Sequence, residues 1–256
     1  MQTITKAGQE PLTHYEKEVL SELRYWQAAM IRQPTLLSRL SKMIQDRFNS
    51  WIPEKIHIAI TTVLKQMIRA VLFASEYTTP RSPDEQSFEA REAAVMKKIN
   101  IYRKTAAVEG GITGAGGIFL GFADFPVLIG IKIKLLFEIA SIYGFDVKDY
   151  RERVYILHIF ELAFSGDIHR KEVYLKMTDW DNKKESELPA DIHQFDWRSF
   201  QQEYRDYIDI AKMAQIIPVI GAPVGVVVNN SLIKKLGTTA MNAYRMRILR
   251  DPDLTA

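Results

Sequence analysis

The chain has 256 residues, of which 47% are hydrophobic and 25% are charged, values typical of a globular protein with a substantial buried core. It contains no cysteine, which excludes disulfides, thiolate metal sites and a cysteine nucleophile. The formal net charge is only +3, and the first residues lack the apolar stretch of a secretory signal peptide, so we expect the protein to reside in the cytoplasm.

Hydrophobic periodicity predicts helices along almost the whole chain, and no stretch shows the apolar alternation of a β-strand. The predicted helices cover residues 13–33, 35–50, 53–72, 83 to about 104–109, 126–143, 149–164, 197–215 and 224–249. The polar stretch 178–197 is predicted to be a surface loop. The pattern indicates an all-α, single-domain helical bundle, in which residues 1–12 form a disordered N-terminal tail and residues 251–256 a C-terminal tail.

Several helix ends carry recognisable start and stop signals. Thr13 and Glu16 have the spacing of a capping box at the start of the first helix. Ser82 and Pro83 are suited to cap and open the fourth helix. Gly144 is suited to end the fifth helix in a left-handed conformation.

Two long apolar segments are interrupted by glycine and proline. The first, EGGITGAGGIFLGFADFPVLIGIK, covers residues 109–132, and the second covers residues 212–234 with no charge between its end lysines. Neither carries a dinucleotide fingerprint or a P-loop, so nucleotide binding is not expected. Each is broken into pieces too short to cross a bilayer. The alternatives are a shallow re-entrant membrane hairpin and a buried pair of helices in a soluble bundle.

Glycines four residues apart let another helix approach closely, and they recur in both segments. The residues that we predict to form this helix-packing or membrane segment are Gly110, Gly114, Gly117, Gly121, Asp124, Pro126, Pro218, Gly221, Gly225 and Asn229. Asp124 stands within an apolar run. It has two interpretations: a cap for a helix that begins at Pro126, which we favour, and an ionisable group buried in the membrane.

Basic residues flank both apolar segments. Residues 14–104 contain 15 Lys and Arg against 10 Asp and Glu, whereas residues 145–212 contain 11 against 15. Ordinary solvated helix faces would also explain this asymmetry, but clusters of cations beside apolar segments suit an anionic lipid surface. The residues that we predict to face lipid are Lys97, Lys98, Arg103, Lys104, Lys234 and Lys235, and the C-terminal run continues through Arg245, Arg247 and Arg250. Nucleic-acid binding is not expected, because no recognition motif is present.

A search for catalytic chemistry finds little. There is no nucleophile-elbow motif, so the sequence predicts no enzyme and no cofactor. His158 and Glu161 share one helix face, and Asp167 and His169 follow closely, so a metal-dependent enzyme that uses these four side chains is kept as an alternative. A helix-face histidine with a polar neighbour is the simpler explanation.

Two stretches resemble the hallmarks of the EcsC family. Residues 111–146 have its glycine-rich run, its Ala-Asp-x-Pro and its Tyr-Gly-Phe-Asp, and residues 216–250 resemble its second hallmark, with Pro-x-x-Gly, a later Asn and a basic terminal helix. With the N-terminal part, which is similar to Bacillus-type members, the resemblance covers about residues 15–250, so residues 13–250 are expected to form one EcsC-like helical domain.

The resemblance implies a bacterial, helical protein with no established catalytic residues. The family's founding member is encoded beside an ABC-type transporter linked to secretion and membrane peptide handling. We therefore expect a non-enzymatic accessory or adaptor protein, peripherally associated with the anionic inner leaflet of the cell membrane and acting with ABC transporter subunits. A soluble helical carrier of an apolar ligand is the remaining alternative.

Overall fold

The computed structural model describes residues 12–32, 54–73, 86–114, 117–166, 169–207 and 221–249. These ranges contain helices and no β-strand, which confirms the all-α prediction. The α-helices are α1 (His14–Ile31), α3 (Glu54–Phe73), α4 (Phe88–Gly114), α5 (Gly117–Ile142), α6 (Tyr150–Phe164), α7 (Arg170–Met177), α8 (Trp180–Glu187), α9 (Trp197–Tyr207) and α11 (Gly221–Ile248); a 3₁₀ helix, η1, covers Ile192–Gln194.

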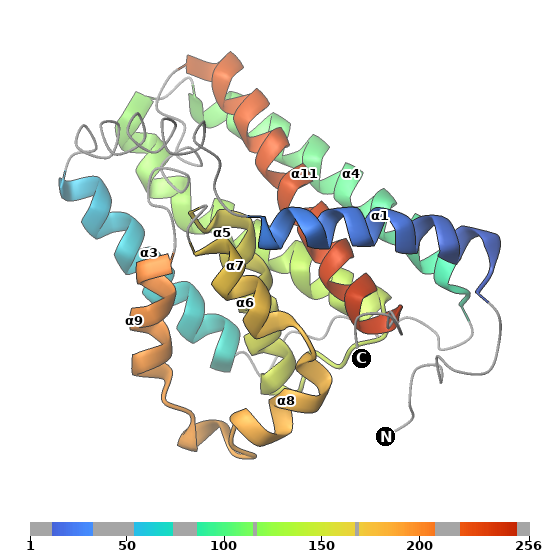
Figure 1. Ribbon diagram of the computed structural model, residues 1–256. Helices are drawn as coiled ribbons and strands as arrows, with labels where there is room; N and C mark the ends of the chain where they lie inside the picture. The colour runs from blue at the N-terminus through green and yellow to red at the C-terminus, as the bar shows by residue number, and fades with distance from the viewer. Residues whose placement is uncertain are drawn as a thin grey trace.

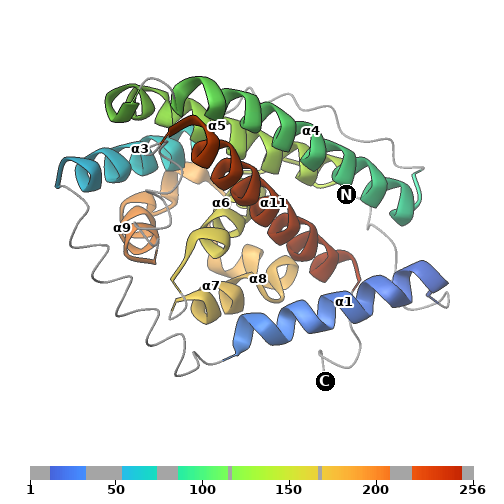
Figure 2. The same cartoon turned by 90° about the horizontal axis from the view of Figure 1, so that it is seen from above.

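Helix α6 forms the centre of the described structure, surrounded by the other helices (Figure 2). All of its residues except Arg151 are buried, and it contacts α3, α5, α7 and α11. The helix starts where the sequence predicts, because the Asp149 side chain accepts a hydrogen bond from the Arg151 backbone N–H at 2.9 Å. Although it carries Glu152, Arg153, His158 and Glu161, α6 is buried on all sides and so forms the centre of the core.

Helices α4, α5 and α11 lie side by side and form one layer of the molecule (Figures 1 and 2). The largest interface joins α4 to α11, which are more than 100 residues apart in the chain. Helix α4 ends at Gly114 and α5 begins at Gly117, so the break in the first apolar segment lies between these two residues. The sequence placed this break at Asp124–Pro126, and that prediction is wrong.

Two of the predicted helix signals are confirmed in detail. The Thr13 hydroxyl accepts from the Glu16 N–H at 3.2 Å, and the Glu16 carboxylate accepts from the Thr13 N–H at 2.8 Å, which completes the capping box. Gly144 has a φ of 91°, which suits a residue without a Cβ. The Phe145 N–H bonds to the Ala140 carbonyl at 3.0 Å, the long hydrogen bond of a Schellman motif.

Other boundaries differ from the prediction. Helix α4 begins at Phe88, and Ser87 rather than Ser82 caps it by accepting from the Ala90 N–H at 3.2 Å. It then continues to Gly114, beyond the predicted end at about 104–109. The predicted surface loop 178–197 contains α8 and η1, and the periodicity did not predict α7. Trp180 explains α8, because its buried side chain holds this polar helix against the core.

Some predictions fall on residues outside the described ranges. These are residues 1–11 of the predicted tail 1–12, the C-terminal tail 251–256, the helix over 35–50, Pro53, Pro83 and the second half of the helix predicted over 197–215. Helix α11 starts at Gly221, slightly before the predicted start at residue 224. Within the described part of the chain, none of the helices is both long enough and apolar enough to span a bilayer.

Candidate functional site

The glycine-rich segments lie at one end of the layer formed by α4, α5 and α11, at the upper left of Figure 1. Their residues occupy the last turns of α4 (Gly110 and Gly114), the first half of α5 (Gly117, Gly121, Asp124 and Pro126) and the first turns of α11 (Gly221, Gly225 and Asn229). Pro218 lies outside the described residues. Both segments therefore belong to helices that contact one another.

Helices α4 and α11 are antiparallel, with a register set by three residue pairs: Glu92 with Arg245, Ile99 with Gly237, and Arg103 with Asn230. Between the first and the last pair the chain advances by 11 residues along α4 and goes back by 15 along α11, so the pairing is antiparallel without an exact one-to-one register. The end of α4, with Gly110 and Gly114, and the start of α11, with Gly221 and Gly225, therefore lie at the same end of this antiparallel pair.

The predicted role of Asp124 as a helix cap is wrong. Helix α5 runs without interruption from Gly117 to Ile142, so Asp124 and Pro126 lie inside it. An N-cap residue must lie outside the helix with a non-helical backbone, which an interior position does not provide. Pro126 likewise occupies an interior position, where its missing N–H leaves the carbonyl four residues earlier without its helical partner.

The outer surface of α4 and α11 carries exposed cations, and we call it the basic face. It comprises the exposed Lys97, Lys104 and Lys234 and the half-buried Arg103, together with the apolar side chains of Met96 and Ile101, each 47% exposed. Lys97, Ile101 and Lys104 follow each other at spacings of four and three, so they share one side of α4. Cations and apolar side chains are thus mixed on one exposed surface.

The two remaining predicted basic residues lie beside this face. The Lys98 ammonium pairs with the Glu138 carboxylate of α5 at 2.9 Å, so its charge is partly neutralised. Lys235 is exposed on α11, next to Lys234 in the chain and about 100° further round the helix. Lys98 and Lys235 therefore contribute less clearly to the basic face than Lys97, Lys104 and Lys234 do.

A polar groove of about 370 Å³ opens between α4 and α11 on the basic face. Its lining residues are Asn100, Arg103 and Lys104 from α4 and Asn230 from α11. The Arg103 guanidinium bridges the two helices, since its Nε donates to Asn230 Oδ1 at 2.7 Å and its Nη1 to Asn100 Oδ1 at 3.2 Å. Arg103 is therefore fixed in position at the base of an open, polar site.

Two cations of the predicted C-terminal basic run, and one at the end of the first apolar segment, are buried. Arg245 and Arg247 are 9% and 8% exposed, and Lys132, which follows the first apolar segment, is fully buried. Burying a cation is costly unless an anion or several acceptors surround it. Arg245 and Arg247 are therefore inside the molecule and do not belong to the basic face, and Arg250 lies outside the described residues.

Arg247 joins three helices in the core. Its Nη1 donates to both carboxylate oxygens of Glu152 in α6 at 2.8 and 2.9 Å, and its Nη2 donates to Asp181 of α8 at 2.6 Å. The guanidinium also lies over the ring of Phe145 at 3.9 Å from its centre. Burial alone would lower the pKa of Arg247, but the two carboxylates outweigh this effect and raise it, so the side chain stays charged.

Arg245 makes a second cluster at the interface of α11 with α4. Its Nε donates to the buried Glu92 carboxylate at 3.0 Å, and the Tyr143 hydroxyl donates to the same carboxylate. Burial, followed by the charge of Glu92, raises the pKa of the Tyr143 hydroxyl well above its usual value. Arg245 also reaches Glu22 of α1 at 3.2 Å, so this cluster attaches the first described helix to the last.

Each of the two histidines of the alternative metal site lies beside a carboxylate from its own segment of the chain. His158 Nδ1 lies 2.8 Å from Glu161 Oε2 inside the core, with the Trp180 and Phe200 rings against the imidazole. His169 instead pairs with Glu172 at 3.1 Å. Asp167 lies outside the described residues, and within the described ranges no three His, Asp or Glu side chains are close enough together to hold a metal.

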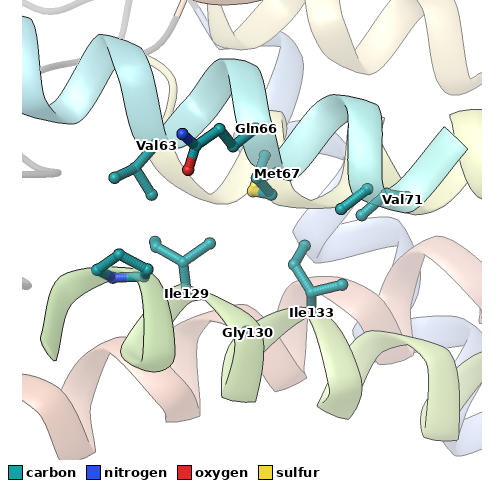
Figure 3. Close-up of a pocket in the computed structure, with 9 residues that line it drawn as sticks. Val63, Gln66, Met67, Val71, Ile129, Gly130 and Ile133 are labelled. Atoms are coloured by element: carbon teal, nitrogen blue, oxygen red, sulfur yellow. The ribbon is translucent and has the colours of Figure 1, made fainter. Parts of the chain in front are cut away.

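An apolar groove of about 180 Å³ separates α3 from α5 (Figure 3). Val63, Met67 and Val71 of α3 face Ile129 and Ile133 of α5 across it. Gly130 and Pro126 complete its floor on the α5 side. Since apolar side chains dominate the lining and Gln66 supplies its polar side chain, the groove suits an apolar ligand better than a charged one.

The sequence did not predict which carboxylates bind the buried arginines. Glu92, Glu152 and Asp181 have no motif around them, and they lie 66 to 153 residues from the arginines they bind. A signal was nevertheless present on α11. Arg245 and Arg247 stand among apolar residues near the end of a helix without a single acidic side chain, so their counter-charges had to come from elsewhere.

Comparison with known proteins gives a consistent result. Residues 17–249 match the EcsC protein family. The protein EcsC of Bacillus subtilis (strain 168) is 42% identical over 234 residues, which cover 91% of this chain and 96% of that protein. The uncharacterized protein YdbA of the same organism is 32% identical over 142 residues, about half of each chain. No protein of known structure matches. The chain belongs to the EcsC protein family.

Proposed function

We propose that this protein is a non-enzymatic adaptor that binds the anionic surface of a membrane through its basic face. The observation that carries the proposal is the mixture of exposed cations with exposed Met96 and Ile101 on one side of α4 and α11. Lysines near anionic lipid attract it by about 1 kcal/mol each, and apolar side chains between them can enter the headgroup layer.

The glycine-rich ends of α4, α5 and α11 extend the proposal. According to this proposal, the two interrupted apolar segments form helical hairpins whose helices pack closely through their glycines. The basic face then binds this end of the bundle to the cytoplasmic leaflet. The charge distribution supports this orientation, since residues 93–108 of α4 and all of α11 contain no acidic residue. The partners expected from the family resemblance, the subunits of an ABC transporter, would then be met at the membrane.

The test is co-sedimentation with neutral and with anionic vesicles across a series of salt concentrations. We expect binding to the anionic vesicles that weakens as salt rises. The triple variant Lys97→Gln, Lys104→Gln and Lys234→Gln removes three exposed cations of the basic face. At about 1 kcal/mol each, their loss should weaken binding roughly hundredfold or more.

A matched control removes the same number of positive charges from other parts of the surface. Lys17→Gln, Lys148→Gln and Lys171→Gln remove three exposed lysines from α1, the turn before α6 and α7. This control triple should lose at most a few-fold in affinity, because its lysines lie off the basic face. Equal losses in both triples, or no binding of the native protein to anionic vesicles, would reject the proposal.

A second candidate function is the binding of an apolar molecule in the groove between α3 and α5. The apolar lining of that groove favours it. Extraction of the purified protein with organic solvent followed by mass spectrometry tests it, and Gly130→Phe, which would place a large side chain at the groove, should prevent co-purification. A protein that carries no apolar molecule, with or without this substitution, would remove the candidate.

A further inference from the structure

The polar groove between α4 and α11 can be assigned a ligand from its hydrogen-bonding groups. Arg103 uses two of its N–H groups to bind the side-chain oxygens of Asn230 and Asn100. Each asparagine has one carbonyl oxygen as its acceptor and one NH₂ group with two donors. Because both oxygens are turned toward Arg103, each asparagine keeps its NH₂ group for another partner.

The groove therefore offers donors and positive charge. The remaining guanidinium N–H groups of Arg103, the exposed ammonium of Lys104 and the two amide NH₂ groups are all donors. In the part of the chain that the structure describes, no carboxylate pairs with Arg103 or Lys104. A site that has several donors from two helices, a positive charge and no counter-ion among the described residues is matched by an anion with several acceptor oxygens.

We propose that this groove binds a phosphate group. A tetrahedral phosphate presents three or four oxygens in different directions, which suits donors that converge from α4 and α11, and a guanidinium matches two of these oxygens. This inference rests on the proposed function, because Lys97, Lys234 and the exposed Met96 and Ile101 surround the groove on the basic face. A lipid headgroup is one source of the phosphate, and free phosphate is the other.

The decisive substitution is Asn230→Asp. The aspartate keeps an oxygen where Arg103 binds, so the contact between the helices is retained or strengthened. It also removes the NH₂ donor and places a negative charge in the groove, so phosphate should be repelled. Lys97→Gln is the matched control, since it lowers the net charge by the same amount on the same face, outside the lining of the groove.

Two arms distinguish the sources of the phosphate. In the first, inorganic phosphate is titrated into each protein by calorimetry; in the second, each protein is sedimented with phosphatidylcholine vesicles with and without phosphatidic acid. Asn230→Asp and Lys104→Gln should each weaken binding by about tenfold or more, since a hydrogen bond to a charged group contributes at least that factor. Lys97→Gln should change the affinity of the protein for inorganic phosphate by less than about twofold. It should also weaken vesicle binding less than Asn230→Asp does.

Each outcome decides the question. A groove-specific loss in both arms, or in the vesicle arm alone, supports a lipid headgroup as ligand. A groove-specific loss in the phosphate arm, with no vesicle binding by the native protein, supports a site for free phosphate and rejects the membrane proposal. Equal losses for Asn230→Asp and Lys97→Gln overturn the phosphate site but leave membrane binding in place. Binding of neither probe by the native protein overturns both. Thermal unfolding of each variant shows whether the fold is intact.

Discussion

Gly237 of α11 faces Ile99 of α4 at a distance that leaves no room for a side chain. A Cβ at this position would lie 2.6 Å from Ile99 Cγ1 and 2.7 Å from its Cδ1. Isoleucine is β-branched and rigid in a helix, so it cannot easily turn away. The close contact between these two helices therefore depends on this glycine, which stands outside the glycine pairs that the sequence pattern singled out.

We expect Gly237→Ala to destabilise the protein by about 1–2 kcal/mol. Overpacking in a core costs about 1–3 kcal/mol, and the better helix propensity of alanine returns about 1 kcal/mol of this. Gly130→Ala is the control, because no atom lies within 4 Å of its added Cβ and the helix propensity alone should make it more stable. Urea unfolding measures both changes.

A double variant tests the cause. In an Ile99→Ala background the clashing atoms are absent, so Gly237→Ala should be neutral or stabilising there. If Gly237→Ala costs the same with and without Ile99, the contact between these two residues does not explain the effect.

At the residue scale, the sequence predicted local interactions well and distant ones poorly. The capping box at Thr13 and the left-handed Gly144 are confirmed because each involves residues within a few positions of one another. The environment of Arg247 could not be predicted, since its carboxylate partners lie in helices far away in the chain. Whether a cation faces lipid or a buried carboxylate depends on packing that periodicity does not specify.

Among the elements, α5 differs most clearly from its prediction, because it passes through Pro126. A proline at the first helical position causes no loss of hydrogen bonding, whereas one inside a helix removes a bond and crowds the preceding turn. The contacts of the helix with α4, α11 and α3 compensate for this defect. A proline after an aspartate looks like a helix start in the sequence, and tertiary packing overrides that signal.

The substitution Pro126→Ala tests whether residue 126 lies inside α5 or at the first position of a helix. At the first residue of a helix the change should have little effect, but inside α5 it should stabilise the protein by up to about 3 kcal/mol, less the packing that the proline ring provides at the groove. The midpoint of thermal unfolding would rise accordingly. An unchanged midpoint would indicate that the helix starts at this proline.

Helix α8 shows why polar segments are hard to predict. Its sequence has little amphipathic character and is followed by Pro189, so it resembles a loop. Two contacts hold it in place, the buried Trp180 and the ion pair of Asp181 with Arg247. Both contacts depend on the finished core, and no short-range pattern reveals them.

For the whole molecule, the sequence predicted the all-α class and showed an uneven distribution of charge. It did not predict which helices pack against each other. Helix α11 has its main interface with α4, and neither hydropathy nor spacing indicated this pairing. The predicted basic residues of α4 and α11 come together only because the two helices are neighbours. The basic face is thus a property of the tertiary fold, built from sequence features that were visible separately.

The ion pairs around Arg247 predict how stability depends on pH. Partial burial would raise the pKa of Asp181, but hydrogen bonds and charge from Arg247 and from Lys184 outweigh it and lower the pKa below its ordinary value. The folded protein therefore binds this proton less readily than the unfolded chain. The contribution of the carboxylate to stability is complete above about pH 5 and is lost as the pH falls below about 4.

To test this role, the unfolding free energies of the native protein and of Asp181→Asn are measured in urea at several pH values between neutral and acidic. The difference in unfolding free energy from the native protein should be constant near neutrality and should shrink on acidification. Glu185→Gln, an exposed acid on the same helix, should give a small difference. A difference for Asp181→Asn that grows as the pH falls would contradict the assigned role of this ion pair.

The buried arginines also affect the order in which the protein can be completed during translation. Each of the four acids precedes the arginine that it binds by 66 to 223 residues: Glu22 and Glu92 bind Arg245, and Glu152 and Asp181 bind Arg247. A ribosome therefore delivers the four carboxylates before either cation. Before α11 is synthesised, Glu92 and Glu152 lack the guanidinium groups of Arg245 and Arg247 that pair with them in the core. Helix α4 also lacks the helix with which it makes its largest interface. The nascent chain must keep these acids hydrated and its helices loosely associated, so the final, cooperative step of folding follows synthesis of α11.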